Sequence, residues 1–130
     1  MFTGLLSGRE RLDALAAATV VVYPSRDEIF GLVPLESLLC GTPVVVCDDS
    51  GCGEVISSTG GGQTVPYADV GSLATAIEDV LGNDHSWRSR ARAAAIVVRR
   101  RYGADEIGRQ LESLYRSVVD RVSAPCRIGA

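Results

Sequence analysis

The sequence predicts an α/β domain in which helices cover a parallel sheet. Its 130 residues are enough for one domain and too few for two. Hydrophobic residues make up 46% of the chain and aromatic residues only 5%, so the core must consist of aliphatic side chains. Short runs of Val alternate with segments of helical spacing, and aliphatic runs of this kind are typical of buried parallel strands.

The first elements already show this alternation. Residues 2–3 are expected to be the end of a strand. Residues 9–18 carry apolar side chains at helical spacing, with Ser7 as the expected N-cap. Residues 19–23 form a β-branched run that ends at Pro24, which predicts a buried strand.

The same order repeats in the middle of the chain. Residues 33–40 are predicted to be a helix, because Pro34 suits its first turn and Gly41 follows its end. Residues 43–46 are the next buried strand. A polar loop over residues 48–53 then leads into a short helical turn.

The remaining elements are a weak strand and three helices. The strand is expected at residues 63–65. Asp69 should cap a helix that ends at Gly82. Two further helices follow, over residues 84–102 and 105–122, in which Trp87, Tyr102 and Tyr115 occur at spacings consistent with core packing.

Strands and helices that alternate with short connections predict parallel strands. Ligands of such sheets bind beyond the carboxyl ends of the strands. Two loops meet that description, residues 24–32 and residues 47–54.

Charge and cysteine content exclude several classes of protein. The net charge of -3 gives no bulk attraction to nucleic acid, and all 13 basic residues are Arg. No apolar stretch approaches the roughly 20 residues that span a bilayer, and the first residues lack the layout of a signal peptide. The cysteines match no zinc pattern, so we expect free thiols in a cytoplasmic protein: Cys40, Cys47, Cys52 and Cys126.

The loop before the second helix has the chemistry of a ligand site. The first N–H groups of a helix lack internal partners and lie at the positive end of its dipole, so they bind phosphate. Gly31 leaves that backbone accessible, and Glu28 and Glu36 flank it with acceptors suited to sugar hydroxyls. The alternative is that Glu36 only complements the helix dipole and Glu28 is a solvated loop carboxylate.

Several short motifs resemble the signature of group 1 glycosyltransferases, which are retaining enzymes of the Rossmann-like GT-B fold. The matching residues are Pro24-Ser25, Glu28, Phe30-Gly31-Leu32, Leu35-Glu36, Gly41-Thr42-Pro43-Val44-Val45 and Gly53-Glu54. The spacing of Glu28 and Glu36 matches the Glu-x7-Glu pair of the family. The resemblance extends from about residue 4 to residue 115.

The resemblance implies a role for each matching position. Glu28 is the implied catalytic residue, facing the donor sugar, and Glu36 would accept hydrogen bonds from the ribose. The backbone of Phe30, Gly31 and Leu32 would meet the sugar and the phosphates, and Ser25 would line the same cleft. The donor would be a nucleotide-diphosphate sugar, with no cofactor and no metal. Leu5 and Leu6 are assigned to the loop near the base.

The second loop has weaker signals. Gly51-x-Gly53 lacks the third small residue of a dinucleotide fingerprint, because position 56 is Ile. Gly53 and Glu54 match the next family motif, although a turn and a helix start explain them equally. Asp48 and Asp49 are expected to be solvated rather than to bind a metal.

The resemblance also implies that the chain is the incomplete C-terminal half of a GT-B enzyme. Residues 1–122 would be the nucleotide-sugar-binding domain without its first strand and helix, and residues 123–130 a flexible tail. The implied partner is the acceptor-binding N-terminal domain, without which we expect no activity. An uncovered sheet edge predicts self-association, and the last helix is expected to leave an apolar face uncovered.

Two alternatives and one further partner stay open. The chain could be a non-catalytic nucleotide-binding or partner module that uses the same cleft. A flavodoxin-like domain would need an acidic phosphoacceptor or a flavin-phosphate loop after the first strand, and neither is visible. Arg99-Arg100-Arg101 is expected to be a solvated helix end, with contact at the inner face of a membrane as the alternative.

Overall fold

A computed structural model describes residues 2–49 and 51–123 of the chain. The chain divides into two compact units, residues 1–99 and residues 100–130. The domain expected over residues 1–122 therefore spans both units. Of the expected tail at residues 123–130, all but the first residue lies outside the described residues.

The first unit contains a parallel sheet of three strands in the order β1-β2-β3. Val22 of β1 pairs with Val45 of β2, and Val46 of β2 pairs with Thr64 of β3. Every residue of the central strand is buried. The parallel α/β fold predicted from the sequence is confirmed, with strands β1 (Val21–Tyr23), β2 (Val44–Cys47) and β3 (Gly62–Val65).

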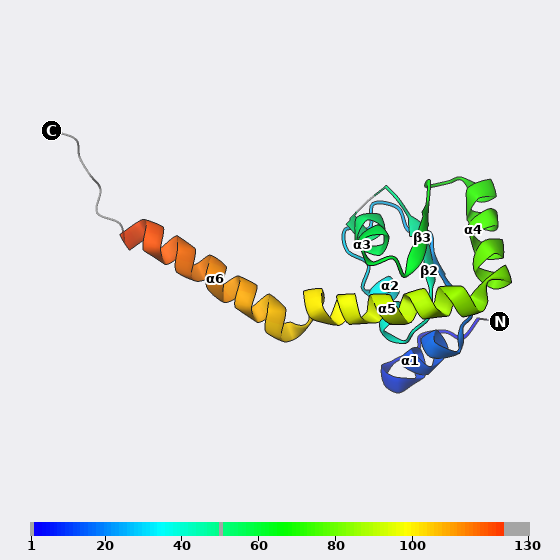
Figure 1. Ribbon diagram of the computed structural model, residues 1–130, viewed down its shortest axis with the longest axis horizontal. Coiled ribbons are helices and arrows are strands. Elements are labelled where there is room, and N and C mark those ends of the chain that lie inside the picture. The colour runs from blue at the N-terminus through cyan, green and yellow to red at the C-terminus, as the bar shows by residue number, and fades with distance from the viewer. Residues whose placement is uncertain (1, 50, 124–130) are drawn as a thin grey trace. The chain divides into compact units, whose positions relative to one another are not determined.

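Helices connect and cover these strands. Figure 1 shows α3 and α4 on opposite sides of β2 and β3. The alternation of side chains along a strand sends neighbouring valines to the two opposite faces. The described helices are α1 (Gly8–Ala17), α2 (Leu32–Leu39), α3 (Gly51–Thr59), α4 (Val70–Gly82), α5 (Asp84–Tyr102) and α6 (Ala104–Ser123).

The core on the α4 side is a cluster of aliphatic side chains around one aromatic ring. Val45 and Val65 of the sheet pack with Val80 of α4 and with Trp87, which is 9% exposed. The indole Nε1 of Trp87 donates a hydrogen bond of 2.9 Å to Asp79 Oδ2. Burial of the ring together with this bond fixes the start of α5 against α4.

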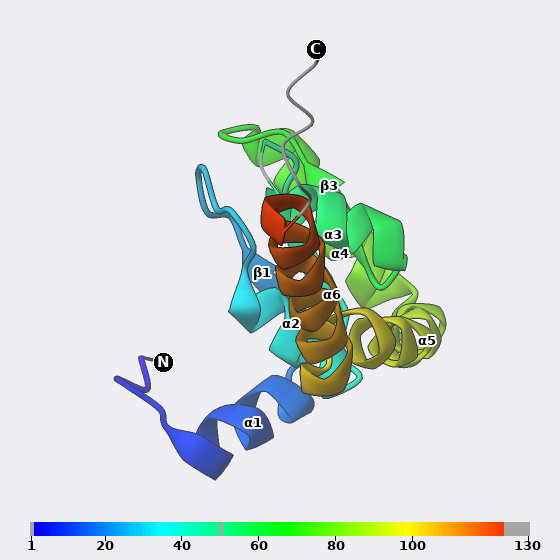
Figure 2. The same cartoon turned by 90° about the vertical axis from the view of Figure 1, so that its left-hand side faces the viewer.

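α1 lies beside α2, as Figures 1 and 2 both show. The Thr42 hydroxyl, just after α2, donates a 2.8 Å hydrogen bond to the carbonyl of Leu15. Cys40 Sγ lies 3.8 Å from the carbonyl of Leu12 and donates to it. Two side chains at the end of α2 thus satisfy carbonyls of α1, which fixes the position of α1 against α2.

Three local predictions need correction. Residues 2–3 do not form a strand, because they have no neighbouring strand to pair with, and Phe2 is fully exposed. Ser7 occupies the N-cap position of α1, but its side chain makes no capping hydrogen bond. The expected turn after the second loop is a full helix, α3, that already begins at Gly51. By contrast, Asp69 caps α4 as predicted and accepts a 2.9 Å hydrogen bond from the Ser72 amide.

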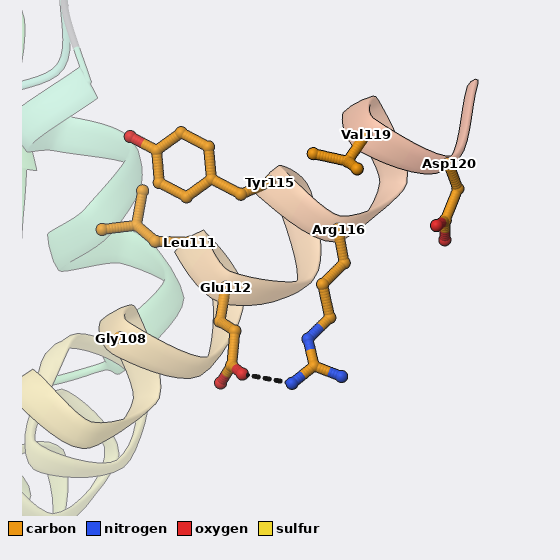
Figure 3. A pocket seen from close by; sticks show the side chains of 7 residues that line it. All are labelled: Gly108, Leu111, Glu112, Tyr115, Arg116, Val119 and Asp120. Atoms are coloured by element: carbon orange, nitrogen blue, oxygen red, sulfur yellow. Dashed lines mark hydrogen bonds and ion pairs between the residues drawn. The ribbon is translucent and has the colours of Figure 1, made fainter. Parts of the chain in front are cut away.

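The described part of the second unit consists mainly of α6, a strongly amphipathic helix. Its large apolar side chains from Ile107 to Val119 are between 39% and 67% exposed, which matches the apolar face expected for the last helix. Tyr115 is 67% exposed, so the prediction that it packs in a core is wrong. Figure 3 shows Leu111, Tyr115 and Val119 along a shallow hollow of about 540 Å³, with the ion pair of Glu112 and Arg116 beside them. None of the helices among the described residues is long and apolar enough to cross a membrane.

Candidate functional site

The candidate site begins where the loop after β1 enters α2. Gly31 is the N-cap of α2, is buried, and adopts a left-handed conformation with φ of 72°. A Cβ at this position would lie 2.5 Å from Cys52 Sγ, so both the conformation and the space require glycine. No side chain caps α2, and its third residue is Pro34, which has no N–H. Of the first three residues of α2, only Leu32 and Val33 therefore carry N–H groups at the positive end of the helix dipole.

Glu28 is held in the loop by both of its carboxylate oxygens. Oε2 accepts a 2.9 Å hydrogen bond from the Tyr23 hydroxyl. Oε1 accepts longer bonds from the amides of Phe30 and Gly31, at 3.5 Å and 3.3 Å. These donors, Tyr23 first, lower the pKa of Glu28 below its ordinary value, because each bond favours the ionised form. Glu28 is therefore an ionised acceptor at neutral pH.

Tyr23 responds in the opposite direction. Its hydrogen bond to Glu28, its burial and the charge of Glu28 raise the pKa of the phenol above 10.0, while a hydrogen bond with Ser25 acts against them. Ser25 is half-buried next to this pair. The structure thus places Ser25 and Glu28, two of the predicted site residues, around the same tyrosine hydroxyl.

The backbone of residues 30–32 has a different environment from the one expected. The amides of Phe30 and Gly31, predicted to meet sugar and phosphate, donate to Glu28. The side chain of Leu32 is 67% exposed and that of Phe30 is 36% exposed. The predicted residues are therefore contiguous, but two of their N–H groups are occupied within the loop.

Glu36, one turn into α2, has two carboxylate oxygens in unlike surroundings. Oε1 forms an ion pair with Nη2 of Arg11, a residue of α1, at a distance of 2.8 Å. Oε2 is buried and has no hydrogen-bond partner among the described residues. An unpaired buried acceptor costs roughly 1–3 kcal/mol, so this oxygen is unusual in a folded chain.

The two loops that were predicted separately meet in the structure. The Cys52 amide donates a 3.2 Å bond to the carbonyl of Glu28, and the Asp27 amide donates a 3.4 Å bond to Asp49 Oδ2. Gly51 packs so closely on the carbonyl of Ile29 that a side chain there would overlap it. The start of α3 thus supports the loop that carries Glu28.

The two residues predicted in the second loop, Gly53 and Glu54, lie in different surroundings. Gly53 is buried, and a Cβ there would lie 2.6 Å from the carbonyl oxygen of Cys47, so glycine is needed for α3 to start against the end of β2. Glu54 is exposed in the first turn of α3, and no contact joins it to Glu28 or Glu36 among the described residues. Cys52 is buried, and burial followed by the charge of Glu28 raises the pKa of its thiol to about 11.

Beyond the carboxyl ends of the strands lies a hollow of about 190 Å³. Pro24, Cys47 and Val65, at the ends of the three strands, line it together with residues 66–70 and Leu73. Arg26 stacks over the ring of Tyr67, with its guanidinium carbon 5.7 Å from the ring centre. The hollow lies where the parallel sheet predicts a ligand. Within residues 2–49 and 51–123, no group of three or more His, Cys, Asp or Glu side chains could hold a metal ion.

Sequence reasoning missed two residues of this site, Arg11 and Tyr23. Tyr23 ends the half-buried strand β1 and carried no signal beyond its place before Pro24. Arg11 belongs to a different helix, and its contact with Glu36 follows only from the packing of α1 on α2.

A family model described as glycosyl transferases group 1 matches residues 1–97. The chain belongs to the group 1 glycosyltransferases. The family resemblance drawn from the short motifs is thereby confirmed.

Curated relatives agree with this membership. The chain is 35% identical over 123 residues to 2-deoxystreptamine N-acetyl-D-glucosaminyltransferase of Streptomyces fradiae, a match that covers 95% of the chain and 29% of that enzyme. It is 40% identical over 93 residues to glycogen synthase of Mycobacterium tuberculosis, covering 72% of the chain and 22% of the relative. The chain thus spans less than a third of the length of these relatives.

Solved structures agree with the fold. Sucrose-phosphate synthase from Thermosynechococcus elongatus superimposes with a TM-score of 0.82 at 31% identity, covering 93% of the chain and 30% of that protein. Anabaena HepE in complex with UDP gives a TM-score of 0.74 at 26% identity, over 80% of the chain and 29% of HepE. The Rossmann-like α/β fold of the GT-B glycosyltransferases is thus confirmed for this chain.

Proposed function

We propose that this glycosyltransferase chain binds a nucleoside-diphosphate sugar at the start of α2 and is the donor-binding part of a retaining enzyme. The observation that carries the proposal is the buried, unpaired Oε2 of Glu36, one turn from the uncapped end of α2. A carboxylate oxygen in that position repels phosphate but accepts from a hydroxyl. A ribose hydroxyl would supply the missing donor and recover the roughly 1–3 kcal/mol that the unpaired oxygen costs.

The other predicted residues have consistent roles in this proposal. Glu28 stays ionised and would accept hydrogen bonds from the donor sugar. The sugar hydroxyls would then replace the two long hydrogen bonds that Glu28 accepts from the amides of Phe30 and Gly31, at 3.5 Å and 3.3 Å. Those two amides and that of Leu32 would then face the sugar and the phosphates, with Ser25 at the edge of the cleft. Gly53 and Glu54 would support the second loop.

The proposed reaction breaks the bond between the anomeric carbon and the diphosphate and forms a bond from the same face of that carbon to the oxygen of an acceptor hydroxyl. The proton of that hydroxyl passes to the leaving diphosphate. The leaving diphosphate gains negative charge, so stabilising that charge is the main requirement. The open end of α2 supplies part of it. Arg11 is ion-paired with Glu36, and Arg26 is ion-paired with Asp27.

Further positive charge would therefore come from a partner. We infer that parts of the enzyme outside this chain supply this charge, that a separate domain binds the acceptor, and that this chain alone does not turn over. The location inferred for this reaction is the cytoplasm. Arg99-Arg100-Arg101 is taken as a solvated helix end, with contact at the inner face of a membrane as the alternative.

A binding titration tests the donor site. The full chain is titrated with UDP, ADP, GDP and their glucose conjugates by calorimetry, and wild type is compared with Glu36→Ala. The loss of a hydrogen bond to a charged group should weaken nucleotide binding by about tenfold or more. Glu78→Ala, an exposed carboxylate of α4, is the matched control and should bind as wild type does. Equal binding by wild type and Glu36→Ala would overturn the ribose contact.

A further inference from the structure

Arg11 pairs with only one of the two carboxylate oxygens of Glu36, which suggests more than an ordinary surface ion pair. Nη2 of Arg11 engages only Oε1, at 2.8 Å, and leaves the buried Oε2 without a partner. The side chain of Glu36 is 24% exposed and that of Arg11 is 45% exposed. One oxygen of the carboxylate is therefore tied to a cation at the surface, while the other points into a covered position.

We propose that Arg11 is a positioning residue for the donor: it holds Oε1 of Glu36, so that the carboxylate keeps one orientation, one turn into α2, for its contact with the ribose hydroxyls. The inference rests on the proposed function of Glu36. Arg11 itself would not touch the donor and would act only through the carboxylate.

The physical need for such a residue follows from the freedom of a glutamate. The terminal torsion of a Glu side chain is broad, so an unheld carboxylate would turn an oxygen toward water rather than keep it buried without a partner. A charge-assisted bond to a planar guanidinium restricts that rotation. The orientation exists before the ligand arrives, so less ordering has to accompany binding.

The helix that carries Arg11 is itself held in place. α1 is attached to α2 through the Thr42 hydroxyl bond to Leu15 at 2.8 Å and through the Cys40 thiol bond to Leu12. Leu12 is the neighbour of Arg11 in the chain. These two hydrogen bonds hold α1 against the end of α2 and thereby set the distance between Arg11 and Glu36.

α1 also contains a matched control. Arg9 pairs with Asp13 on its own helix at 3.7 Å, and both side chains are largely exposed, at 91% and 69%. It has the same chemistry and the same helix as Arg11 but no contact with α2 among the described residues. Arg9→Gln thus removes one positive charge from α1 without changing Glu36.

The experiment measures how strongly the full chain prefers a ribonucleotide. Dissociation constants are determined for UDP, ADP and GDP and for their 2′,3′-dideoxy counterparts, with wild type, Arg11→Gln, Arg11→Lys, Arg9→Gln and Glu36→Gln. Thermal unfolding of each variant is recorded alongside. A change of fold stability alone alters binding of both nucleotides equally, whereas a positioning role alters their ratio.

We expect Arg11→Gln to reduce the preference for the ribonucleotide by about tenfold, as for the loss of one hydrogen bond to a charged group, with little change for the dideoxy form. Arg11→Lys should restore part of that ratio, and Arg9→Gln should leave it as in wild type. If Arg11→Gln keeps the wild-type preference for the ribonucleotide while Glu36→Gln loses it, the positioning role of Arg11 is overturned. The proposed donor site at Glu36 is then still supported.

Other outcomes also decide between the two proposals. Equal weakening of both nucleotide forms by Arg11→Gln would mean that Arg11 binds phosphate or supports the fold, and would overturn the positioning role. An unchanged ratio in Glu36→Gln, or no nucleotide binding by wild type, would overturn the donor site itself and with it the role of Arg11.

Discussion

Tyr23 and Glu28 hold each other in opposite protonation states at the centre of the site. The hydrogen bond of 2.9 Å between them raises the pKa of the phenol and lowers the pKa of the carboxyl group. The loop therefore presents a neutral donor and an ionised acceptor over the whole physiological pH range. A glutamate that is to bind neutral sugar hydroxyls has to stay in this ionised state.

Replacing Tyr23 by Phe should raise the pKa of Glu28 toward its ordinary value of 4.5, because the largest stabiliser of the carboxylate is removed. A lowered folded-state pKa gives stability that is present above the ordinary value and is lost as pH falls through the folded pKa. Tyr23→Phe should therefore lose less stability than wild type between pH 6 and about pH 3. Carboxyl NMR titration and urea unfolding at several pH values measure both effects.

Tyr115→Phe on α6 is the control for this prediction and should match wild type in both measurements. If the pKa of Glu28 does not change in Tyr23→Phe, the two backbone amides rather than the phenol determine the charge of Glu28.

The site residues themselves were more predictable than their partners. Glu28, Gly31 and Glu36 were identified from spacing and from the physics of a helix start, and all three occupy the expected loop and first turns. Arg11 and Tyr23 were not, because their contacts depend on side-chain direction and on the packing of one helix against another. The amides of Phe30 and Gly31 were expected to be free, since hydrogen bonds from a loop to its own side chain are not visible in a pattern.

At the scale of elements, α3 shows how glycine can mislead. Gly51 and Gly53 suggested a loop, yet both lie inside the first turn of a helix. They are required because carbonyl oxygens of Ile29 and Cys47 approach their backbones. The three strands of the sheet and α4 lie where the sequence predicts them, because Val runs and an Asp cap depend on local chemistry that tertiary contacts did not override. The strand expected at residues 2–3 was wrong, and β1 is half-buried rather than buried.

Two Gly to Ala substitutions should have opposite effects on stability. Gly53→Ala would place a methyl group 2.6 Å from the Cys47 carbonyl oxygen, and overpacking of this kind costs roughly 1–3 kcal/mol. Gly82→Ala, at the last residue of α4 with open space around it, should gain up to about 1 kcal/mol from helix propensity.

Urea unfolding of both variants measures the difference in free energy of unfolding. A stabilised Gly53→Ala would show that β2 and α3 can separate at little cost, which contradicts the close approach. Nucleotide binding should weaken in Gly53→Ala and stay unchanged in Gly82→Ala.

At the scale of the whole molecule, the sheet has two open edges. β1 and β3 each pair on one side only among the described residues. Unpaired edges of a sheet favour association with another chain. α6 adds an exposed apolar face, which is a second source of association.

The chain should therefore self-associate, with a weight-averaged mass that rises with concentration in light scattering. If the sheet edge is responsible, the combined substitution of Leu111→Glu and Val118→Glu on α6 should leave the association in place. A loss of association in that variant would assign it to α6 instead, and a monomer at all concentrations would contradict the prediction altogether.

The contact between the two loops has a consequence for redesign. The carbonyl of Glu28 accepts from Cys52, and Ile29 packs on Gly51, so the loop of Glu28 and the start of α3 form one surface. Exchanging residues 24–36 for those of a relative, in order to change the donor sugar, would set a foreign loop on an unmatched helix. The smallest transplantable piece is therefore discontinuous, residues 24–36 together with residues 48–54, and libraries that vary only one segment should yield few folded members.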